Sequence, residues 1–391
     1  MEDILFQNGL VYLDGRFRAV SLLARAEKIA AVDAPPAPDC RVVDLAGKML
    51  VPGFLDIHTH GGGGVDVNAA DGSGFAAISR FFAAQGTTGW LCSILTDSEE
   101  RTLWSIAQAR AAMDAPAQGA RLLGIHLEGP FLSPDYKGAM PEHLLRTGDT
   151  ALFRRYQDAA NGTVRYLTVA PEVPGVVDMI GEIDRQVTVA IGHSGADYET
   201  SIRAIDAGAR ACTHTFNAMA LFHQHHPAIM GAVLERPVFC EAICDGRHLH
   251  PGTVRMLLAC KGWDKVVAVT DSIQAAGLPD GQYKLGVNDV VVRNGDAVLA
   301  DTGVRAGSTL TTGQALKNLV GFTGESVERV LPLLTANPAR LIGLESKGVI
   351  APGMDADLVV LDRALDVCAT YVAGQRVWPT PEQQTLSNDS F

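Results

Sequence analysis

The chain contains seven cysteines, but their spacing is typical neither of a disulfide-rich protein nor of a zinc site built from thiolates. They are odd in number, scattered and without a CxxC pair, so neither a set of disulfides nor a thiolate zinc site is indicated. An uninterrupted apolar run of roughly 18 residues, which a membrane span requires, is also missing. The N-terminus opens with acids and then alternates, whereas a secretory signal opens with basic residues. We expect a cytoplasmic protein with no membrane partner.

Basic residues are also fewer than acidic residues. The 32 Lys and Arg residues stand against 44 Asp and Glu residues, which gives a formal net charge of −12. Because this charge repels phosphate backbones, we do not expect a nucleic-acid partner, and an anionic ligand must be held by local cations. Charged residues make up only 19% of the chain and apolar residues 47%, a composition that fills a large core and excludes a disordered chain.

From residue 51 onward, short β-branched runs alternate with alanine-rich stretches, the pattern of βα units. Eight parallel strands separated by helices close a barrel. We therefore predict an α/β fold, with a (β/α)8 TIM-like barrel over residues 51–344. The eight runs predicted as its strands are residues 51–57, 89–95, 122–128, 164–170, 187–193, 209–215, 239–244 and 266–271.

The two ends of the chain differ from this middle part. Residues 1–50 and residues 345–391 contain short alternating segments separated by turn residues, which is typical of antiparallel strands. We predict that both ends contribute to one small β-sandwich domain, followed by a polar tail. After the eighth run, residues 284–308 resemble a hairpin insertion, and the segments up to residue 344 have a helical pattern.

Histidine or carboxylate side chains stand at the ends of five of the eight runs. His58 and His60 lie two apart on a strand, so their side chains point the same way. A lone HxH pair can be two polar residues at a strand end, but four more runs end in such groups, at the face where barrel enzymes assemble their sites. The residues that end the other four runs are Glu128, His193, His214 and Asp271.

These side chains predict a catalytic metal centre. Imidazole and carboxylate ligands without thiolate suit zinc most simply, and iron or manganese as well, with one or two ions in each subunit. A bound divalent ion lowers the pKa of its water and polarises a nearby carbonyl. Asp271 can accept the proton of that water and return it to a departing amine, or serve as a plain ligand.

Five segments in sequence order, HLEGP, GHSGA, THTFNAM, DGRHLH and VTDS, resemble motifs of the N-acetylglucosamine-6-phosphate deacetylase family of the amidohydrolase superfamily. The resemblance spans nearly the whole chain, including VPGFLDIHTH and GVIAPGMDADLVVLD. It implies a metal-dependent amide hydrolase that converts N-acetylglucosamine 6-phosphate to glucosamine 6-phosphate and acetate. It also implies a homodimer. The fourth run lacks the lysine that many relatives carbamylate, which agrees with this family.

The resemblance also assigns residues to roles. Glu128, His193 and His214 look like the ligands of the principal metal, and His58 and His60 like the extra ligands of members that hold a second ion. Asp271 resembles the general base and acid, and His248 a substrate-binding histidine that helps to hold the oxyanion. The positions that match substrate contacts are Ala139, Asn217, Ala218, Ala306, Gly307 and Ser308.

Four positions depart from the family pattern. Met140 stands where the family usually has a histidine, and His225 stands where an arginine from a neighbouring subunit grips the 6-phosphate. Histidine gives phosphate a weaker and pH-dependent contact. Arg247 and Arg305 stand where the family often has an apolar residue, and each is either a new cationic contact to the ligand or a solvated surface arginine.

Two alternatives remain open at this stage. The departures motivate a related deacylase that acts on another N-acyl sugar, such as a galactosamine isomer or an unphosphorylated or carboxylated sugar. A non-catalytic barrel that serves as a scaffold is a third reading. Relatives of that third kind usually lose ligands, whereas the whole set of ligands and the base are present here.

Overall fold

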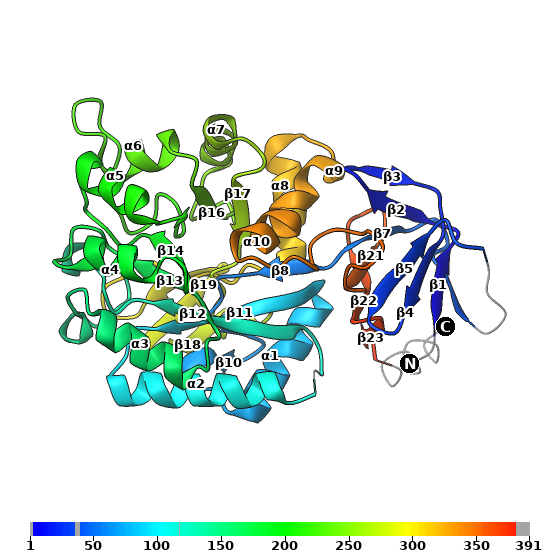
Figure 1. Cartoon of the computed structure of the whole chain (residues 1–391), viewed down its shortest axis with the longest axis horizontal. Coiled ribbons are helices and arrows are strands. Elements are labelled where there is room, and N and C mark those ends of the chain that lie inside the picture. Colours follow the sequence, from blue (N-terminus) through cyan, green and yellow to red (C-terminus); the bar gives the residue numbers. More distant parts are fainter. Residues whose placement is uncertain (1–2, 36–39, 117, 381–391) are drawn as a thin grey trace.

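A computed structural model of the chain describes residues 3–35, 40–116 and 118–380. Eight parallel strands form one sheet in the order β17-β16-β15-β14-β13-β12-β11-β8, so that each strand lies beside its neighbours along the chain (Figure 1). The strands are β8 (Phe54–Asp56), β11 (Thr87–Leu95), β12 (Arg121–Glu128), β13 (Val164–Val169), β14 (Thr188–Ile191), β15 (Ala211–Cys212), β16 (Phe239–Ile243) and β17 (Val266–Val269). Each of the eight predicted runs overlaps one of them.

Backbone hydrogen bonds join the first strand to the eighth just beyond their ends. The Asp271 amide donates to the His58 carbonyl at 2.8 Å, and the His60 amide donates to the Ser272 carbonyl at 2.7 Å. Three of the four residues in these bonds, His58, His60 and Asp271, were predicted site residues. The contact that closes the barrel therefore also fixes the relative position of His58, His60 and Asp271.

A helix follows each barrel strand and covers the outside of the barrel (Figure 1). Several of these helices begin at a residue whose side-chain oxygen accepts a hydrogen bond from a backbone amide of the first turn, as Asp71, Ser98, Asp149, Asp197 and Thr311 do. The eight helices are α1 (Gly72–Ala84), α2 (Glu99–Asp114), α3 (Thr150–Ala159), α4 (Val176–Ile183), α5 (Tyr198–Ala207), α6 (Ala228–Glu235), α7 (Pro251–Lys261) and α8 (Thr312–Thr323). The predicted helical segment near residue 344 forms α9 (Val327–Val330), a 3-10 turn (Leu331–Leu334) and α10 (Ala336–Leu341).

The barrel mouth carries its own small elements. The predicted hairpin insertion is a three-stranded antiparallel sheet that begins slightly earlier, with β18 (Gly281–Leu285), β19 (Asn288–Arg293) and β20 (Asp296–Leu299). Its inner side chains form a separate apolar cluster with Leu95, Leu132 and Met140. The other elements near the mouth are β9 (Gly61–Gly62), β10 (Val65–Asp66) and 3-10 turns at Val67–Ala69, Pro134–Tyr136 and Glu142–Leu144.

Both ends of the chain form the second domain, where the blue and red strands lie together in Figure 1. One sheet has the order β5-β4-β1-β6 and the other β23-β22-β21-β7-β2-β3, and the two share an apolar core that includes Phe6, Leu22, Leu50 and Tyr371. The strands are β1 (Ile4–Gln7), β2 (Leu10–Leu13), β3 (Arg16–Arg18), β4 (Leu22–Arg25), β5 (Lys28–Val32), β6 (Arg41–Asp44), β7 (Met49–Pro52), β21 (Leu358–Leu361), β22 (Val367–Val372) and β23 (Gln375–Trp378).

The predicted fold class is confirmed. Strand β7 extends to Pro52 and pairs with β21, so residues 51 and 52, predicted as the start of a barrel strand, belong to the sandwich sheet. The division of the chain at residues 50/51 and 344/345 stays a prediction, and the tail beyond Thr380 lies outside the described residues.

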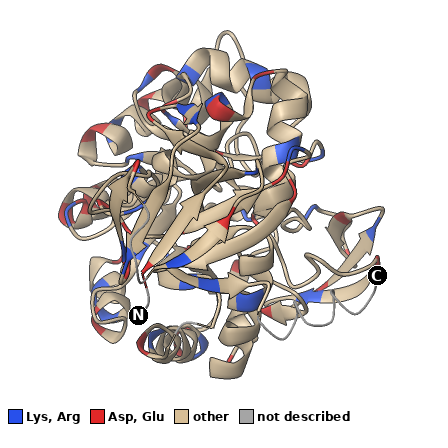
Figure 2. Cartoon of the chain, turned by 90° about the vertical axis from the view of Figure 1, so that its right-hand side faces the viewer, with Lys and Arg blue, Asp and Glu red and all other residues tan. Residues whose placement is uncertain are grey.

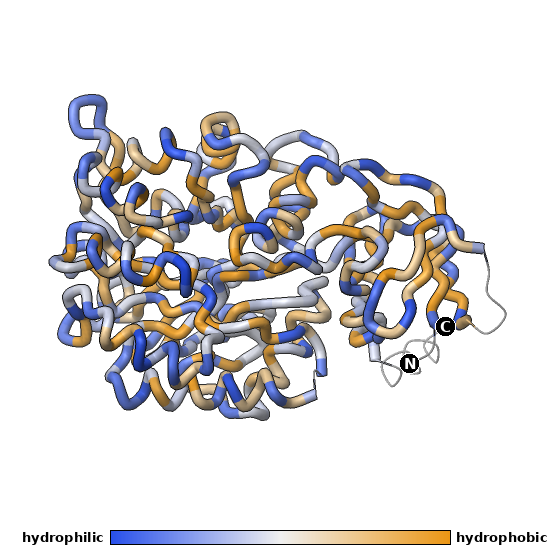
Figure 3. Tube along the Cα trace, in the orientation of Figure 1, coloured by the Kyte–Doolittle hydropathy of each residue, from blue (hydrophilic) through white to orange (hydrophobic). Residues whose placement is uncertain are grey.

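The distribution of side chains follows this architecture. Hydrophobic residues line the barrel strands and the interior of the sandwich (Figure 3), whereas basic and acidic residues are interspersed over the outer helices and loops (Figure 2). Among the residues described, none of the helices combines the length and the apolar content needed to cross a membrane.

Candidate active site

The five predicted metal ligands and the predicted base Asp271 meet at the carboxyl ends of the barrel strands. Each is buried, with 7% or less of its surface exposed. They form two groups, one of His58, His60 and Asp271 and one of Glu128, His193 and His214, and within each group the potential ligand atoms lie within 4.8 Å of one another. Histidines and carboxylates that converge in this way fit a divalent ion.

The Glu128, His193 and His214 group is held by short contacts. Glu128 Oε1 lies 3.3 Å from His193 Nε2 and 3.3 Å from His214 Nε2, and the two nitrogens are 2.9 Å apart. Three ligand atoms from three strands thus face one point. Three protein ligands leave room for water or substrate, which is the arrangement of a catalytic rather than a structural ion.

The second group adjoins the first through Glu128. His60 Nε2 lies 3.2 Å from Asp271 Oδ1 and 3.2 Å from Glu128 Oε2, and His58 Nε2 lies 3.3 Å from Glu128 Oε1. The distance from His58 Nε2 to Asp271 Oδ1 is 3.6 Å. Because Glu128 contacts imidazoles of both groups, the two groups form one continuous cluster of potential ligands.

Hydrogen bonds on the far side of the rings test whether these imidazoles fit a metal. His58 Nδ1 lies 2.9 Å from Glu241 Oε2, His60 Nδ1 lies 3.0 Å from the Ser93 carbonyl, and His193 Nδ1 lies 2.8 Å from the Tyr136 carbonyl. Carbonyl and carboxylate oxygens can only accept, so Nδ1 carries the proton in each ring. The Nε2 atoms face the shared space, and each has a free lone pair there when its ring is neutral, as metal ligation requires.

The charge distribution also favours a cation at this place. Burial alone lowers the pKa of His60, but its hydrogen bonds to Asp271 and Glu128 outweigh this effect and raise that pKa to about 9. Burial raises the pKa of Asp271, but the charges of His58 and His60 outweigh it and lower that pKa below its usual value. The pocket therefore keeps its carboxylates ionised and attracts positive charge, whether a proton or a metal ion.

Three of the six residues adopt a left-handed backbone that non-glycine residues rarely use. The φ angles are 47° at His193, 26° at His214 and 49° at Asp271. Such conformations cost on the order of 1–3 kcal/mol each and cluster at functional sites. After β15 this turn begins immediately, which is why the run predicted over residues 209–215 yields a strand of only two residues.

A pocket of about 450 Å³ opens above this cluster, and all six side chains except that of His58 line it. His248 lines it, with its Nδ1 held by Asp245 Oδ2 at 2.7 Å, which leaves the other ring nitrogen for a ligand. The predicted substrate residues that line the pocket are Ala139, Asn217, Ala218, Arg305, Ala306 and Gly307.

Three predicted substrate residues do not line this pocket. Ser308 is buried beneath it and donates to the Thr270 carbonyl at 2.6 Å. Arg247 is exposed and donates to the Asn294 carbonyl at 2.6 Å. His225 lies in an exposed loop beside His223, with a ring separation of 5.5 Å. In this single chain, none of the three side chains reaches the pocket surface.

Arg305 lines the pocket but is already paired. Its Nε lies 2.9 Å from Asp296 Oδ1 and its second amino group 3.0 Å from Asp296 Oδ2, a bidentate ion pair. The guanidinium is therefore fixed in place rather than freely solvated, and it presents only part of its donor edge to the pocket.

Comparisons with known proteins agree with this geometry. A model of the Amidohydrolase family matches residues 49–377. The N-acetylglucosamine-6-phosphate deacetylase of Bacillus subtilis (strain 168) is 34% identical over 393 residues, which cover 98% of this chain and 96% of that protein. The chain belongs to the N-acetylglucosamine-6-phosphate deacetylase family of the amidohydrolases. It is therefore a hydrolase of carbon–nitrogen amide bonds.

Two further relatives bear on the substrate of this amidohydrolase. A solved structure of the N-acetyl-D-glucosamine-6-phosphate deacetylase of Mycobacterium smegmatis, an aspartate-to-alanine variant in complex with N-acetyl-D-glucosamine-6-phosphate, matches with a TM-score of 0.90 and 35% identity, covering 96% of this chain and 100% of that chain. The N-acetylgalactosamine-6-phosphate deacetylase of Escherichia coli O157:H7 is 34% identical and covers 89% of this chain and 92% of that protein. Overall similarity therefore does not separate the two sugar epimers.

Several residues of the amidohydrolase site were not singled out from the sequence. Lys137 lines the pocket and lies in the segment between β12 and α3. This segment has no periodic pattern of apolar residues from which its position could be predicted. Asp245, which orients His248, and Glu241, which contacts His58, were also missed. Glu241 had a recognisable signal, because it is a single acid within the otherwise apolar strand FCEAI.

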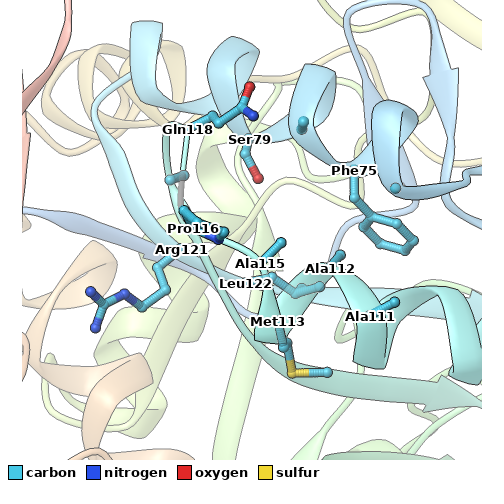
Figure 4. A pocket seen from close by; sticks show the side chains of 13 residues that line it. Phe75, Ser79, Ala111, Ala112, Met113, Ala115, Pro116, Gln118, Arg121 and Leu122 are labelled. Carbon is cyan, nitrogen blue, oxygen red and sulfur yellow. The ribbon is translucent and has the colours of Figure 1, made fainter.

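A second hollow of about 420 Å³ lies outside the barrel, between α1 and the C-terminal end of α2 (Figure 4). Its lining includes Phe75, Met113 and Pro116 together with several alanines, and Arg121 is its one charged residue. None of the six ligands is in that lining. The chemistry of this amidohydrolase therefore belongs to the pocket at the barrel mouth.

Proposed function

We propose that the chain hydrolyses the N-acetyl group of an amino sugar phosphate, converting N-acetylglucosamine 6-phosphate to glucosamine 6-phosphate and acetate. The observation that carries this proposal is the convergence of both ligand groups and His248 on one pocket of about 450 Å³. The relatives named for this activity, which match nearly the full length of the chain, support it.

The proposed centre holds one or two divalent ions. Glu128, His193 and His214 would bind the principal ion, and His58, His60 and Asp271 would accommodate a second. Nitrogen and oxygen ligands without thiolate favour zinc, with iron or manganese as alternatives. An ion held there lowers the pKa of water and polarises the amide carbonyl of the substrate.

Asp271 is proposed as the general base and acid. Its carboxylate is ionised, it lies 3.2 Å from His60 Nε2, and it lines the pocket. It can accept a proton from the attacking water and deliver it to the departing sugar nitrogen. His248, held from behind by Asp245, is proposed to hydrogen-bond the oxygen of the substrate carbonyl, where negative charge develops during the attack.

Cations at the rim are proposed to bind the phosphate. Lys137 and Arg305 both line the pocket, so a negatively charged group on the sugar would meet them there. Ala139, Asn217, Ala218, Ala306 and Gly307 are proposed as further substrate contacts, whereas the buried Ser308 side chain would support the loop beneath them. Arg247 and His225 would contribute only if a further part of the molecule or a second subunit brought them closer.

A second candidate is a deacylase for a different N-acyl sugar, and one observation favours it. Met140 is 3% exposed, lines the pocket and belongs to the apolar cluster with Leu285. An apolar surface replaces a hydrogen-bonding side chain at this point, which changes the sugar hydroxyls that the pocket can satisfy.

We also propose a cytoplasmic homodimer. Leu221 and Phe222 are 75% and 57% exposed in the loop that carries His225, and a second subunit would cover them. Cys92, Cys212, Cys240 and Cys244 are buried thiols, which suits a reducing compartment. Sedimentation at several concentrations tests the dimer, and a monomer at all of them would contradict it.

Acetate release by the zinc-loaded protein tests the function. The substrates are N-acetylglucosamine and N-acetylgalactosamine, each with and without a 6-phosphate. We expect the phosphorylated glucosamine compound to be turned over fastest. A preference for another of the four supports the second candidate, and no release from any of them contradicts both.

A further inference from the structure

Glu241 is a buried carboxylate that contacts a residue of each ligand group, and no step of the proposed reaction assigns it a role. It lies in the middle of β16, is fully buried, and follows no motif of the site. Moving an ionised carboxylate from water into a protein interior costs several kcal/mol unless it is paired and hydrogen-bonded. Its presence therefore calls for an explanation from its contacts.

The first contact is with His58. Glu241 Oε2 lies 2.9 Å from His58 Nδ1, and both side chains are fully buried. A carboxylate only accepts, so the proton stays on Nδ1 and the lone pair of Nε2 faces Glu128 and Asp271. His60 and His193 donate the Nδ1 proton to backbone carbonyls. His58 instead donates it to a charged side chain, and a charge-assisted hydrogen bond is stronger.

The second contact is with His214. The same Oε2 atom accepts a hydrogen bond from the His214 backbone amide at 2.9 Å. This amide begins the turn in which His214 has a φ of 26°. One oxygen atom of Glu241 is thus bonded to a residue from each ligand group, His58 in one and His214 in the other.

A purely structural role explains these contacts poorly. The other oxygen, Oε1, makes no hydrogen bond of regular geometry among the residues described. The buried Tyr166 hydroxyl is nonetheless close, because burial and then the Glu241 carboxylate raise the pKa of Tyr166. Burial of a carboxylate costs free energy even when it is paired, and an apolar side chain of similar volume is often neutral or better at such a position. A carboxylate at position 241 is explained if its function is to accept the hydrogen bonds of His58 and His214.

We infer that Glu241 is a positioning residue of the metal centre, which fixes His58 in its Nδ1–H form and anchors the backbone of His214, so that both ligand groups are held by one carboxylate. This inference rests on the proposed metal centre. It requires no contact between Glu241 and substrate.

Two substitutions of nearly equal size test the inference. Glu241→Met removes the acceptor and fills the same space, whereas Glu241→Gln keeps one oxygen that can accept from His58. Asp357→Asn in the sandwich domain is the control for the loss of a buried carboxylate, because Asp357 contacts Lys347 and the Ala373 amide and no residue of the site. The measurement is Co²⁺ binding by calorimetry together with the visible spectrum of the Co²⁺ protein.

Loss of an outer hydrogen-bond partner of a metal ligand typically weakens metal binding by about 10- to 100-fold. We expect that loss in Glu241→Met, with a changed Co²⁺ spectrum, and binding within about tenfold of wild type in Glu241→Gln and Asp357→Asn. Wild-type binding by Glu241→Met, or binding by Glu241→Gln as weak as that of Glu241→Met, overturns the inference. A wild-type protein that binds no Co²⁺ instead overturns the proposed metal centre, and the inference with it.

A measurement on Glu241→Gln covers the case in which Glu241→Met does not fold. The proton on His58 Nδ1, assigned by its loss in His58→Gln, should resonate downfield in the wild-type spectrum and move upfield when the charged acceptor becomes an amide. A resonance that stays unchanged in Glu241→Gln, or a His58 Nδ1 proton that exchanges too fast to observe in the wild type, contradicts the inference.

Discussion

The Nε2 atoms of His193 and His214 lie 2.9 Å apart at the floor of the pocket. His193 donates its other ring proton to the Tyr136 carbonyl, so its Nε2 carries a lone pair that points at the second ring. Two imidazole nitrogens at this separation are joined either by a proton that His214 Nε2 donates or by a metal ion that both nitrogens bind. Glu128 Oε1, 3.3 Å from each nitrogen, supplies the matching negative charge.

Replacement of His214 by alanine therefore tests whether a metal ion binds to these two rings. We expect the variant to bind zinc more weakly by over 100-fold, because loss of a ligand exceeds the roughly 10- to 100-fold effect of losing a ligand's outer partner. His250→Asn is the matched control, since His250 is exposed, belongs to neither ligand group and is not in the pocket lining. The check is zinc content after dialysis, and equal content in His214→Ala and wild type would mean that a proton, not a metal, joins the rings.

Replacement of Asp271 by asparagine separates its chemical role from its ligand role. We expect kcat for acetate release to fall by on the order of 10²–10⁴, the range that a positioned acid or base contributes. The principal ion should remain, because Asp271 is not in the group of Glu128, His193 and His214. Full turnover by a zinc-loaded Asp271→Asn protein would eliminate Asp271 as the base and acid.

The ligands were predictable because two regularities act together in a barrel. Parallel strands deliver their last residues to one face, and side chains two apart on a strand point the same way, so His58, His60, Glu128, His193, His214 and Asp271 could be grouped without coordinates. The positions of the strand ends were therefore sufficient to predict the metal site.

Lys137 and Glu241 show where that reasoning stops. Lys137 lies in the connection after β12, and the fold of this segment depends on the neighbours against which it packs. Glu241 points into the barrel at mid-strand, and its importance depends on a contact with His58 that is 183 positions away in the sequence. Contacts of this kind follow from the closed geometry of the barrel rather than from local pattern.

Lys137 and Arg305 at the pocket rim should lower KM only for negatively charged substrates. Charge-assisted hydrogen bonds contribute about 1.5–3 kcal/mol, so Lys137→Met and Arg305→Met should each raise KM for a 6-phosphorylated sugar by roughly 10- to 100-fold. KM for the unphosphorylated sugar should change little. Arg329→Met is the matched control, because Arg329 is outside the pocket lining and forms an exposed ion pair with Glu325. An equal rise in KM for both forms of the sugar would mean that these cations shape the pocket and do not bind phosphate.

Asp355 provides a test of stability far from the active site. It lies 2.5 Å from Lys28 Nζ and 2.8 Å from Lys347 Nζ, and so joins the N-terminal strand β5 to the segment before β21. Burial raises the pKa of Asp355, but these hydrogen bonds outweigh it and lower that pKa to about 2. Since the unfolded chain has a value of about 3.9, the ionised carboxylate stabilises the folded state above that pH.

This contribution should disappear as the pH falls from about 4 towards 2, because protonation then occurs in both states. At pH 7 we expect Asp355→Asn to reduce the free energy of unfolding by about 1–2 kcal/mol, a value discounted for the exposure of Lys28. Urea denaturation at pH 7, 4 and 3 measures the difference between variant and wild type, which should shrink at the lower values. Asp14→Asn, at an exposed pair with Arg18, is the control and should show no such trend. If the Asp355→Asn difference is the same at all three pH values, the carboxylate contributes through packing and not through its charge.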